Sequence, residues 1–314
     1  LDFTSSFYGA LSMGMPVDAA MGEARLAMGR GKGRPLEWAT PLLTQRTPDG
    51  RIVSLASDSE EQRYQFNIVS FDDHGRERFD KYGAALLRLD EFFDGRPIRA
   101  PELWTEEILP GLKGWLRKGI LPEQKSRINF AAHLTIVLAT GRLLDVKSRR
   151  DVIVQQYDVD WDAEKGNPLP SPVWERNLPI EVVDENKTDL AVAVSLSRSI
   201  LPGVQEYVSR GEGPAAQIGS ILDATPTTGV GPTSVRDGVH ASQLAQELIN
   251  RLDEELANRP GTTIHLFLSA PQAFTFFFGM RTRSIPRLQM YEHHFGQGSS
   301  TYVPSVLFQG DGAY

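Results

Sequence analysis

Hydroxyl and guanidinium side chains directly follow an apolar segment near the middle of the chain. Residues 189–197, DLAVAVSLS, are apolar at most positions and lead into Ser197, Arg198 and Ser199. A segment that is apolar on both faces is typical of a central parallel strand. Two hydroxyls, one guanidinium and the N–H groups of the following helix could bind a phosphate group there. An ordinary capped turn between a strand and a helix is the alternative interpretation.

A second strand is expected at residues 262–270, TTIHLFLSA, and a helix follows it. Ser269 suits the N-cap of that helix, and Pro271 suits an early helical position. We expect Phe274, Phe276, Phe277 and Phe278 in the core, with ligand contact by Phe274 as the alternative. The candidate ligand-binding residues at this strand end are Ser269, Ala270, Pro271, Gln272 and Phe274. Phe274 is included because, of the phenylalanines in this segment, it lies nearest the helix start.

Two further segments complete the candidate ligand-binding set. The apolar segment 151–158, DVIVQQYD, ends on Gln156 and Tyr157. The segment 224–238, ATPTTGVGPTSVRDG, contributes Thr227 and Gly229 but has no glycine-rich nucleotide motif. We interpret it as a loop over a pocket, with a simple connecting loop as the alternative. Asp237 is expected to be the N-cap of the helix that follows.

These segments need an α/β scaffold in which the ends of parallel strands face one pocket. Strands alternate with helices through the second half, which indicates a mostly parallel sheet. His133 and His240 each lie near a helix start, so we expect two related α/β halves that form one pocket. Helices are expected at 86–96, 103–119 (bent at Pro110), 129–146, 200–210, 240–258 and 272–280, and strands at 215–224, 288–295 and 302–309, with an edge strand or hairpin at 63–71.

Composition narrows the function further. The 314 residues carry a net charge of −7, which argues against a protein that coats duplex nucleic acid. No segment is apolar enough to span a bilayer and no signal peptide is evident, so we expect a cytoplasmic protein without a membrane partner. There is no cysteine, and the adjacent His293 and His294 would point to opposite faces of a strand. We assign no catalytic residue, metal or cofactor.

Residues 1–47 differ from the rest of the chain. Pro16 and the apolar residues after it indicate a helix, a glycine-rich turn follows, and residues 36–45 suit a short strand. One helix and one edge strand cannot form a core by themselves. We therefore expect that the chain is part of a longer protein, with a connector over 48–84.

Several motifs together resemble the SAVED domain over roughly residues 85–310. They are FFDGRPIRAPELWTEEILPGL, AHLTIVLATGRLL before VIVQQYDVDW, then DGVHASQLA, HLFLSAPQAFTFFFG, QMYEHH and YVPSVLF. The resemblance implies two fused CARF-like, Rossmann-like halves, about 85–180 and 181–314. Residues 1–47, with FYGALSMGMPVDAAMGEARLAM and EWATPLL, resemble the C-terminal end of a CHAT caspase-like protease domain, whose catalytic His and Cys are not in this sequence.

The resemblance implies a bacterial antiviral sensor. Its ligand would be a cyclic oligoadenylate, with three or four nucleotides, produced by a cyclic-nucleotide synthase (CBASS) or a type III CRISPR complex. Binding would promote self-association, as a head-to-tail filament, and activate the linked CHAT protease. The alternative is a nucleotide-processing Rossmann-like enzyme that acts at the same strand ends.

Overall fold

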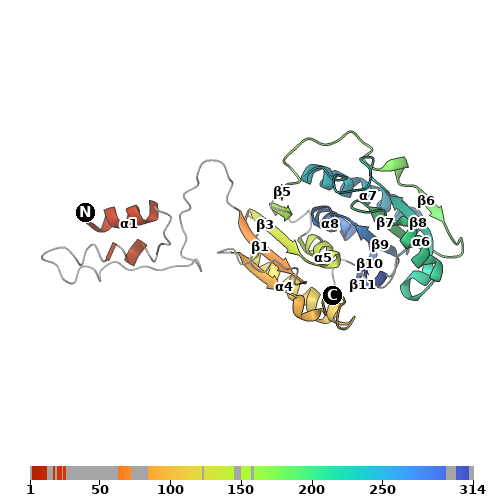
Figure 1. Cartoon of the computed structure of the whole chain (residues 1–314), viewed down its shortest axis with the longest axis horizontal. Helices are drawn as coiled ribbons and strands as arrows, with labels where there is room; N and C mark the ends of the chain where they lie inside the picture. The colour runs from red at the N-terminus through yellow and green to blue at the C-terminus, as the bar shows by residue number, and fades with distance from the viewer. Residues whose placement is uncertain are drawn as a thin grey trace. The chain divides into compact units, whose positions relative to one another are not determined.

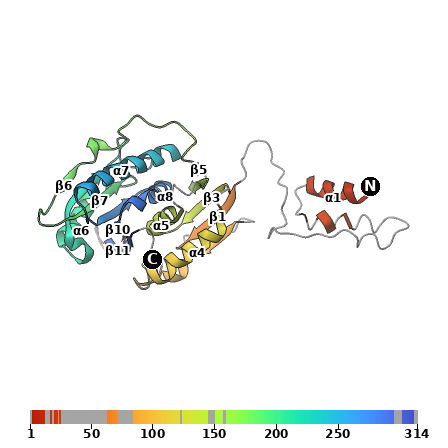
Figure 2. The same cartoon turned by 180° about the vertical axis from the view of Figure 1, so that it is seen from behind.

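The computed structural model describes residues 2–12, 17, 20–22, 24–25, 63–71, 84–121, 124–144, 150–156, 159–294 and 302–310 (Figures 1 and 2). The chain divides into two compact units, Leu1–Gln62 and Arg63–Tyr314. In the first unit α1 spans Asp2–Ser12, and Ala10, Val17 and Ala20 form a small buried cluster. The strand expected over 36–45 lies outside the described residues.

The second unit begins with a five-stranded sheet in the order β2-β1-β3-β4-β5. Its first four strands pair in parallel, and β5 pairs antiparallel to β4. A π-helical turn, η3, leads directly into α4, and the backbone angles of Ile108 and Leu109 are helical, so the helix runs on through Pro110 without a break. The elements are β1 (Tyr64–Val69), β2 (Ala85–Arg88), η2 (Asp90–Phe92), η3 (Trp104–Ile108), α4 (Leu109–Gly119), β3 (Ser126–Ala131), α5 (Leu134–Leu144), β4 (Val152–Gln156) and β5 (Val159–Trp161).

Three expectations for this half were wrong. Residues 86–96 form part of β2 and one 3₁₀ turn rather than a helix, because the short apolar segment ALLR pairs with β1. The helix expected from residue 129 begins at Leu134, since Ser126–Ala131 is a strand with alternating burial. Residues 64–69 form an inner strand between β2 and β3, so the sheet begins within the segment expected to be a connector.

The other half contains a six-stranded sheet in the order β11-β10-β9-β7-β8-β6. Its four inner strands pair in parallel, and β6 and β11 pair antiparallel at the edges. This confirms the α/β class with two mostly parallel sheets. The elements are η5 (Glu175–Asn177), β6 (Ile180–Val182), β7 (Asp189–Ser195), α6 (Leu201–Arg210), η6 (Gly213–Gln217), β8 (Ile218–Ala224), α7 (Gly238–Asn258), β9 (Ile264–Ser269), α8 (Gln272–Gly279), η7 (Thr282–Ser284), β10 (Arg287–His293) and β11 (Tyr302–Gln309).

The internal repeat is β3-α5-β4-β5 against β9-α8-β10-β11. In both copies the helix starts three residues after the strand ends, at Leu134 after Ala131 and at Gln272 after Ser269. His133 therefore corresponds to Pro271. The pairing of His133 with His240 was wrong, because His240 lies in α7, which precedes β9 instead of following it.

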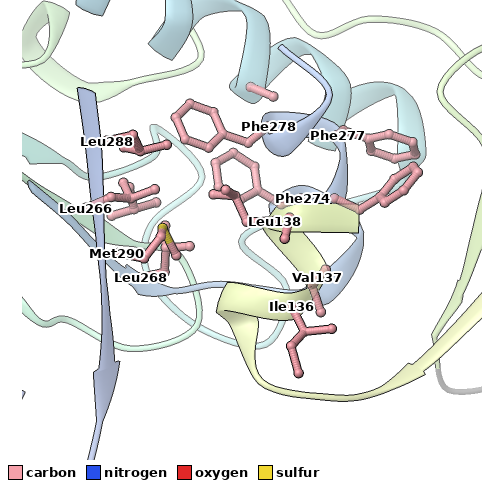
Figure 3. Close-up of a cluster of buried hydrophobic side chains, with 14 of the residues drawn as sticks. Ile136, Val137, Leu138, Leu266, Leu268, Phe274, Phe277, Phe278, Leu288 and Met290 are labelled. Carbon is pink, nitrogen blue, oxygen red and sulfur yellow. The ribbon is translucent and has the colours of Figure 1, made fainter. Parts of the chain in front are cut away.

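The two halves meet where α5 packs against α8, within one continuous hydrophobic core (Figure 3). Gly141 and Gly279 occupy equivalent positions in the two helices and allow the backbones to touch. A Cβ on Gly141 would lie 2.2 Å from the Phe276 carbonyl oxygen, and one on Gly279 would lie 2.3 Å from that of Leu138. The halves therefore share a close contact related by approximate two-fold symmetry. Among the described helices, none is both long and apolar enough to cross a bilayer.

Candidate functional site

The ends of β7 and β9 lie side by side and bring two of the predicted segments together. Ser195 pairs in register with Ser269. Beyond the ladder, the N–H groups of Leu196 and Ser197 both donate to the Ser269 carbonyl oxygen, at 2.9 and 2.7 Å. The buried Ser195 hydroxyl accepts a hydrogen bond of 3.1 Å from the Ile200 N–H, which holds the turn leading into α6. Ser197 and Ser269 are thus placed at one edge of the sheet.

Arg198 and Ser199 are exposed at this edge. Within the described part of the chain, the Arg198 guanidinium makes no hydrogen bond or ion pair. The Arg198 charge also acts on the end of β10. Burial is the main cause that lowers the pKa of His293, and repulsion from His294 and Arg198 lowers this pKa further. Arg198 is therefore a cation available to a ligand, and its position agrees with the predicted strand end.

The β9 end passes directly into α8. Ser269, Ala270, Pro271 and Gln272 are half-buried, and the N-cap is Pro271 rather than the expected Ser269. The Gln272 side-chain amide donates to the Ala132 carbonyl oxygen in the other half at 3.4 Å. This contact places the β9 end beside the β3 end.

Phe274 differs from the other residues assigned to this strand end. Its ring is fully buried, is stacked 5.8 Å from Phe278, and lies edge-on to Trp174. Because core side chains enclose the ring, it is not placed to stack on a ligand. Phe276, Phe277 and Phe278 are also buried, which confirms their expected place in the core.

Each central helix is capped by a side chain from the opposite half. The Gln156 side-chain oxygen accepts from the Ala273 N–H near the start of α8, at 3.3 Å. At the equivalent position in α5, the Thr135 N–H donates to a Glu292 carboxylate oxygen at 2.8 Å. The cap at α5 is thus a carboxylate and the cap at α8 is a neutral amide. Tyr157 lies outside the described residues.

The loop 225–237 lies over the β7 end. The Gly231 N–H donates to the Leu196 carbonyl oxygen at 2.8 Å, and Thr227 bonds through its N–H and hydroxyl to the Val173 carbonyl oxygen. Gly229 has a φ of 80°, which a residue with a Cβ rarely adopts. The Asp237 carboxylate accepts from the His240 N–H at 2.8 Å, which confirms the expected N-cap of α7.

Sequence reasoning missed a buried cluster at the strand ends of the first half. The Ser70 hydroxyl lies 2.7 Å from His133 Nδ1 and accepts from the His133 backbone N–H, while His133 Nε2 lies 2.8 Å from the Arg96 carbonyl oxygen. Donation from Nε2 to that carbonyl leaves Nδ1 to accept from Ser70. Phe93 stacks on the imidazole at 4.2 Å. Burial is the main cause that lowers the pKa of His133.

This cluster closes the ends of β1 and β3 with aromatic and imidazole rings. The sequence signal was the position of Ser70 and Phe71 directly after the expected strand segment QFNIV. The predicted residues of the second half, apart from Phe274, instead lie at strand ends that keep exposed or half-buried polar groups. The fold is that of a duplicated Rossmann-like domain, and polar groups gather at this edge of its second half.

Residues 109–308 match the model of the SAVED family, the "SMODS-associated and fused to various effectors sensor domain". Because that match covers well over half of the 314 residues, the chain belongs to the SAVED family. A curated relative, CD-NTase-associated protein 4 of Enterobacter hormaechei subsp. hoffmannii (strain UCI 50), is 27% identical over 257 residues, which are 80% of this chain and 50% of the relative.

Solved structures show the same fold. Two are of the Acinetobacter baumannii Cap4 SAVED/CARF-domain containing receptor, one with the cyclic trinucleotide 3'3'3'-cAAA and one with 2'3'3'-cAAA. Their TM-scores are 0.56 and 0.58, each at 12% identity, and they cover 78% and 79% of this chain and 52% of each receptor. This chain thus spans about half the length of the relatives it matches.

Proposed function

We propose that residues 63–314 bind a cyclic oligoadenylate of three or four nucleotides at the ends of β7, β8 and β9, as a sensor in bacterial antiviral defence. The observation that carries the proposal is the open edge at Ser197, Arg198 and Ser199 in a chain of the SAVED family. The two similar Acinetobacter baumannii structures are receptors with cyclic trinucleotides, which supports this class of ligand.

The site suits a ring of phosphates and bases. Arg198 would form charge-assisted bonds with a phosphate oxygen, and the N–H groups at the start of α6 would add favourable partial charges. The loop around Thr227 and Gly229 lies over the β7 end and would contact the ring from above. A catalytic role would require a general base or nucleophile beside the bound phosphate. The predicted residues supply donors and hydroxyls instead, so we favour binding without cleavage.

The signalling step is the finer part of the proposal. Ligand binding would favour self-association, and head-to-tail stacking would give an open filament if no ring closes. The ligand can shift such an equilibrium only if it binds the associating state more tightly. The resemblance of residues 1–47 to the end of a CHAT domain supports activation of a linked protease, and the relatives' greater length leaves room for a further domain.

One set of measurements on the 314-residue chain tests the proposal. Calorimetric titration with 3'3'3'-cAAA, cyclic tetra-adenylate and a cyclic dinucleotide measures binding, chromatography of the same samples detects cleavage, and light scattering detects association. We expect saturable binding of a cyclic oligoadenylate that is recovered intact. Absence of heat with all three compounds would refute the sensor proposal, whereas linear products would favour the nucleotide-processing enzyme.

A further inference from the structure

A small basic pocket lies at the opposite end of α5 from Thr135. It has a volume of about 120 Å³, well above the roughly 10–15 Å³ that one water needs. Its lining comes from α4, the last residues of α5, the segment just before β4, and η7. It comprises Lys113, Leu116, Arg117, Leu143, Leu144, Arg150 and Arg283. Since α5 has 11 residues and is about 16 Å long, this pocket is separate from the strand ends of the candidate site.

The charge of the lining favours an anion with more than one negative charge. Four of the seven lining residues are cationic and none is acidic, in a chain whose net charge is −7. Arg150 is half-buried, and its buried Nε has no hydrogen-bond acceptor among the residues that the structure describes. A buried donor without an acceptor is unfavourable, so a bound oxyanion would stabilise this arrangement.

Favourable interactions with the C-terminal ends of helices do not explain the positions of all four cationic lining residues. Cations in the last turn of a helix complement its dipole, which explains Arg117 in α4. At the end of α5, however, that role belongs to Arg142, which lies outside the pocket and donates to the carbonyl oxygens of Thr282 and Gly310. Arg150 lies before β4 and belongs to no helix, so it is not a last-turn cation of α4 or α5.

We propose that this pocket binds a phosphate group, either as inorganic phosphate or as the phosphate of a mononucleotide. Three guanidinium groups suit a phosphate because each can donate two parallel hydrogen bonds to its oxygens. Leu116, Leu143 and Leu144 supply an apolar wall for a ring attached to the phosphate. The proposal concerns residues distinct from the candidate site, so it stands or fails independently of the proposed function.

The test titrates the 314-residue chain with inorganic phosphate and, separately, with AMP at fixed ionic strength. We expect saturable binding with a Kd of about 1 mM or tighter, weakened by about tenfold or more in the double variant Arg150→Gln/Arg283→Gln. Arg210→Gln, which alters an exposed arginine on α6, is the matched control and should bind as the wild type does. If the double variant unfolds, the exposed Arg117→Gln serves instead.

The two phosphate sources are distinguished by their affinities. Tighter binding of AMP than of phosphate supports a mononucleotide that uses the leucine wall, and equal affinities support inorganic phosphate. An unsaturable response, or an unchanged Kd in the folded double variant, would overturn the proposal. The proposal also fails if phosphate binding is lost in Arg198→Ala but persists in the double variant, because the phosphate would then bind at the strand ends.

Discussion

The two halves of the second unit share a repeat but differ at their strand ends. In the first half Ser70, His133 and Phe93 close the ends of β1 and β3. In the second half the equivalent edge exposes Arg198 and Ser199. By the strand registers, Phe71 in the first half corresponds to Ser197 in the second. The Arg96 guanidinium lies over the Phe71 ring. The fold thus creates two equivalent edges, and the side chains make one a packed core and the other a polar surface.

The helix contact shared by both halves should show the largest effect. Gly141→Ala would place a methyl group 2.2 Å from the Phe276 carbonyl oxygen, so α5 and α8 must separate. We expect a loss of about 3 kcal/mol in the free energy of unfolding, at the upper end of overpacking effects. The control is Gly114→Ala in α4, where a Cβ meets no atom within 4 Å. Urea unfolding should give little loss or a small gain for the control, and equal losses would contradict the close contact.

The open edge should carry the binding energy for the ligand. Arg198→Ala removes a charge-assisted bond worth about 1.5–3 kcal/mol, so cyclic oligoadenylate affinity should fall roughly ten- to a hundredfold. Arg96→Ala, at the closed edge, is the control and should change thermal stability but not affinity. Calorimetry on the folded variants measures both, and an unchanged Kd for Arg198→Ala would remove this residue from the site.

The closed edge should instead make stability depend on pH. Burial lowers the pKa of His133 in the folded state below the unfolded value near 6.5. Between these two pKa values the unfolded chain binds a proton that the folded chain does not, so stability falls as pH decreases from 7 towards 5, by at most about 1.4 kcal/mol per pH unit for this group. His240, His265 and His293 have pKa values lowered in the same direction.

A variant isolates the part that His133 contributes. His133→Asn should make the dependence of the urea midpoint on pH shallower between pH 7 and 5, although the variant itself is less stable. An unchanged slope would mean that the closed edge does not respond to protonation of this imidazole.

The reciprocal helix caps should give the smallest effect. Glu292→Gln removes a carboxylate from the α5 N-terminus and should cost about 0.3–1 kcal/mol of stability. Gln156→Glu adds a carboxylate at the α8 N-terminus and should raise stability by a similar amount while it weakens binding of an anionic ligand nearby. Thermal unfolding and calorimetry at low salt would detect these opposite signs. Changes of the same sign in both variants would show that the two caps are not equivalent.

Regular periodicity made most of the second half predictable. The apolar segments at β7, β8 and β9 and the Asp237 cap of α7 follow directly from local patterns. The first half was less predictable, because ALLR and SRINFA are short segments in which strand and helix patterns are not distinct. Tyr64–Val69, which is β1, was expected to be an edge strand or part of a hairpin for another reason. Its partner β2 begins 16 residues after β1 ends, so no local signal marks β1 as an inner strand.

The sequence by itself determined the α/β class, the strands of the second half and the polar residues that follow them, because burial periodicity and capping are local properties. Only the tertiary structure decided which strand ends are open. The contacts that close or join them link residues far apart in the chain: 63 positions separate Ser70 from His133, 117 separate Gln156 from Ala273, and 157 separate Thr135 from Glu292. Periodicity reports whether a side chain is buried, but not which distant group lies against it.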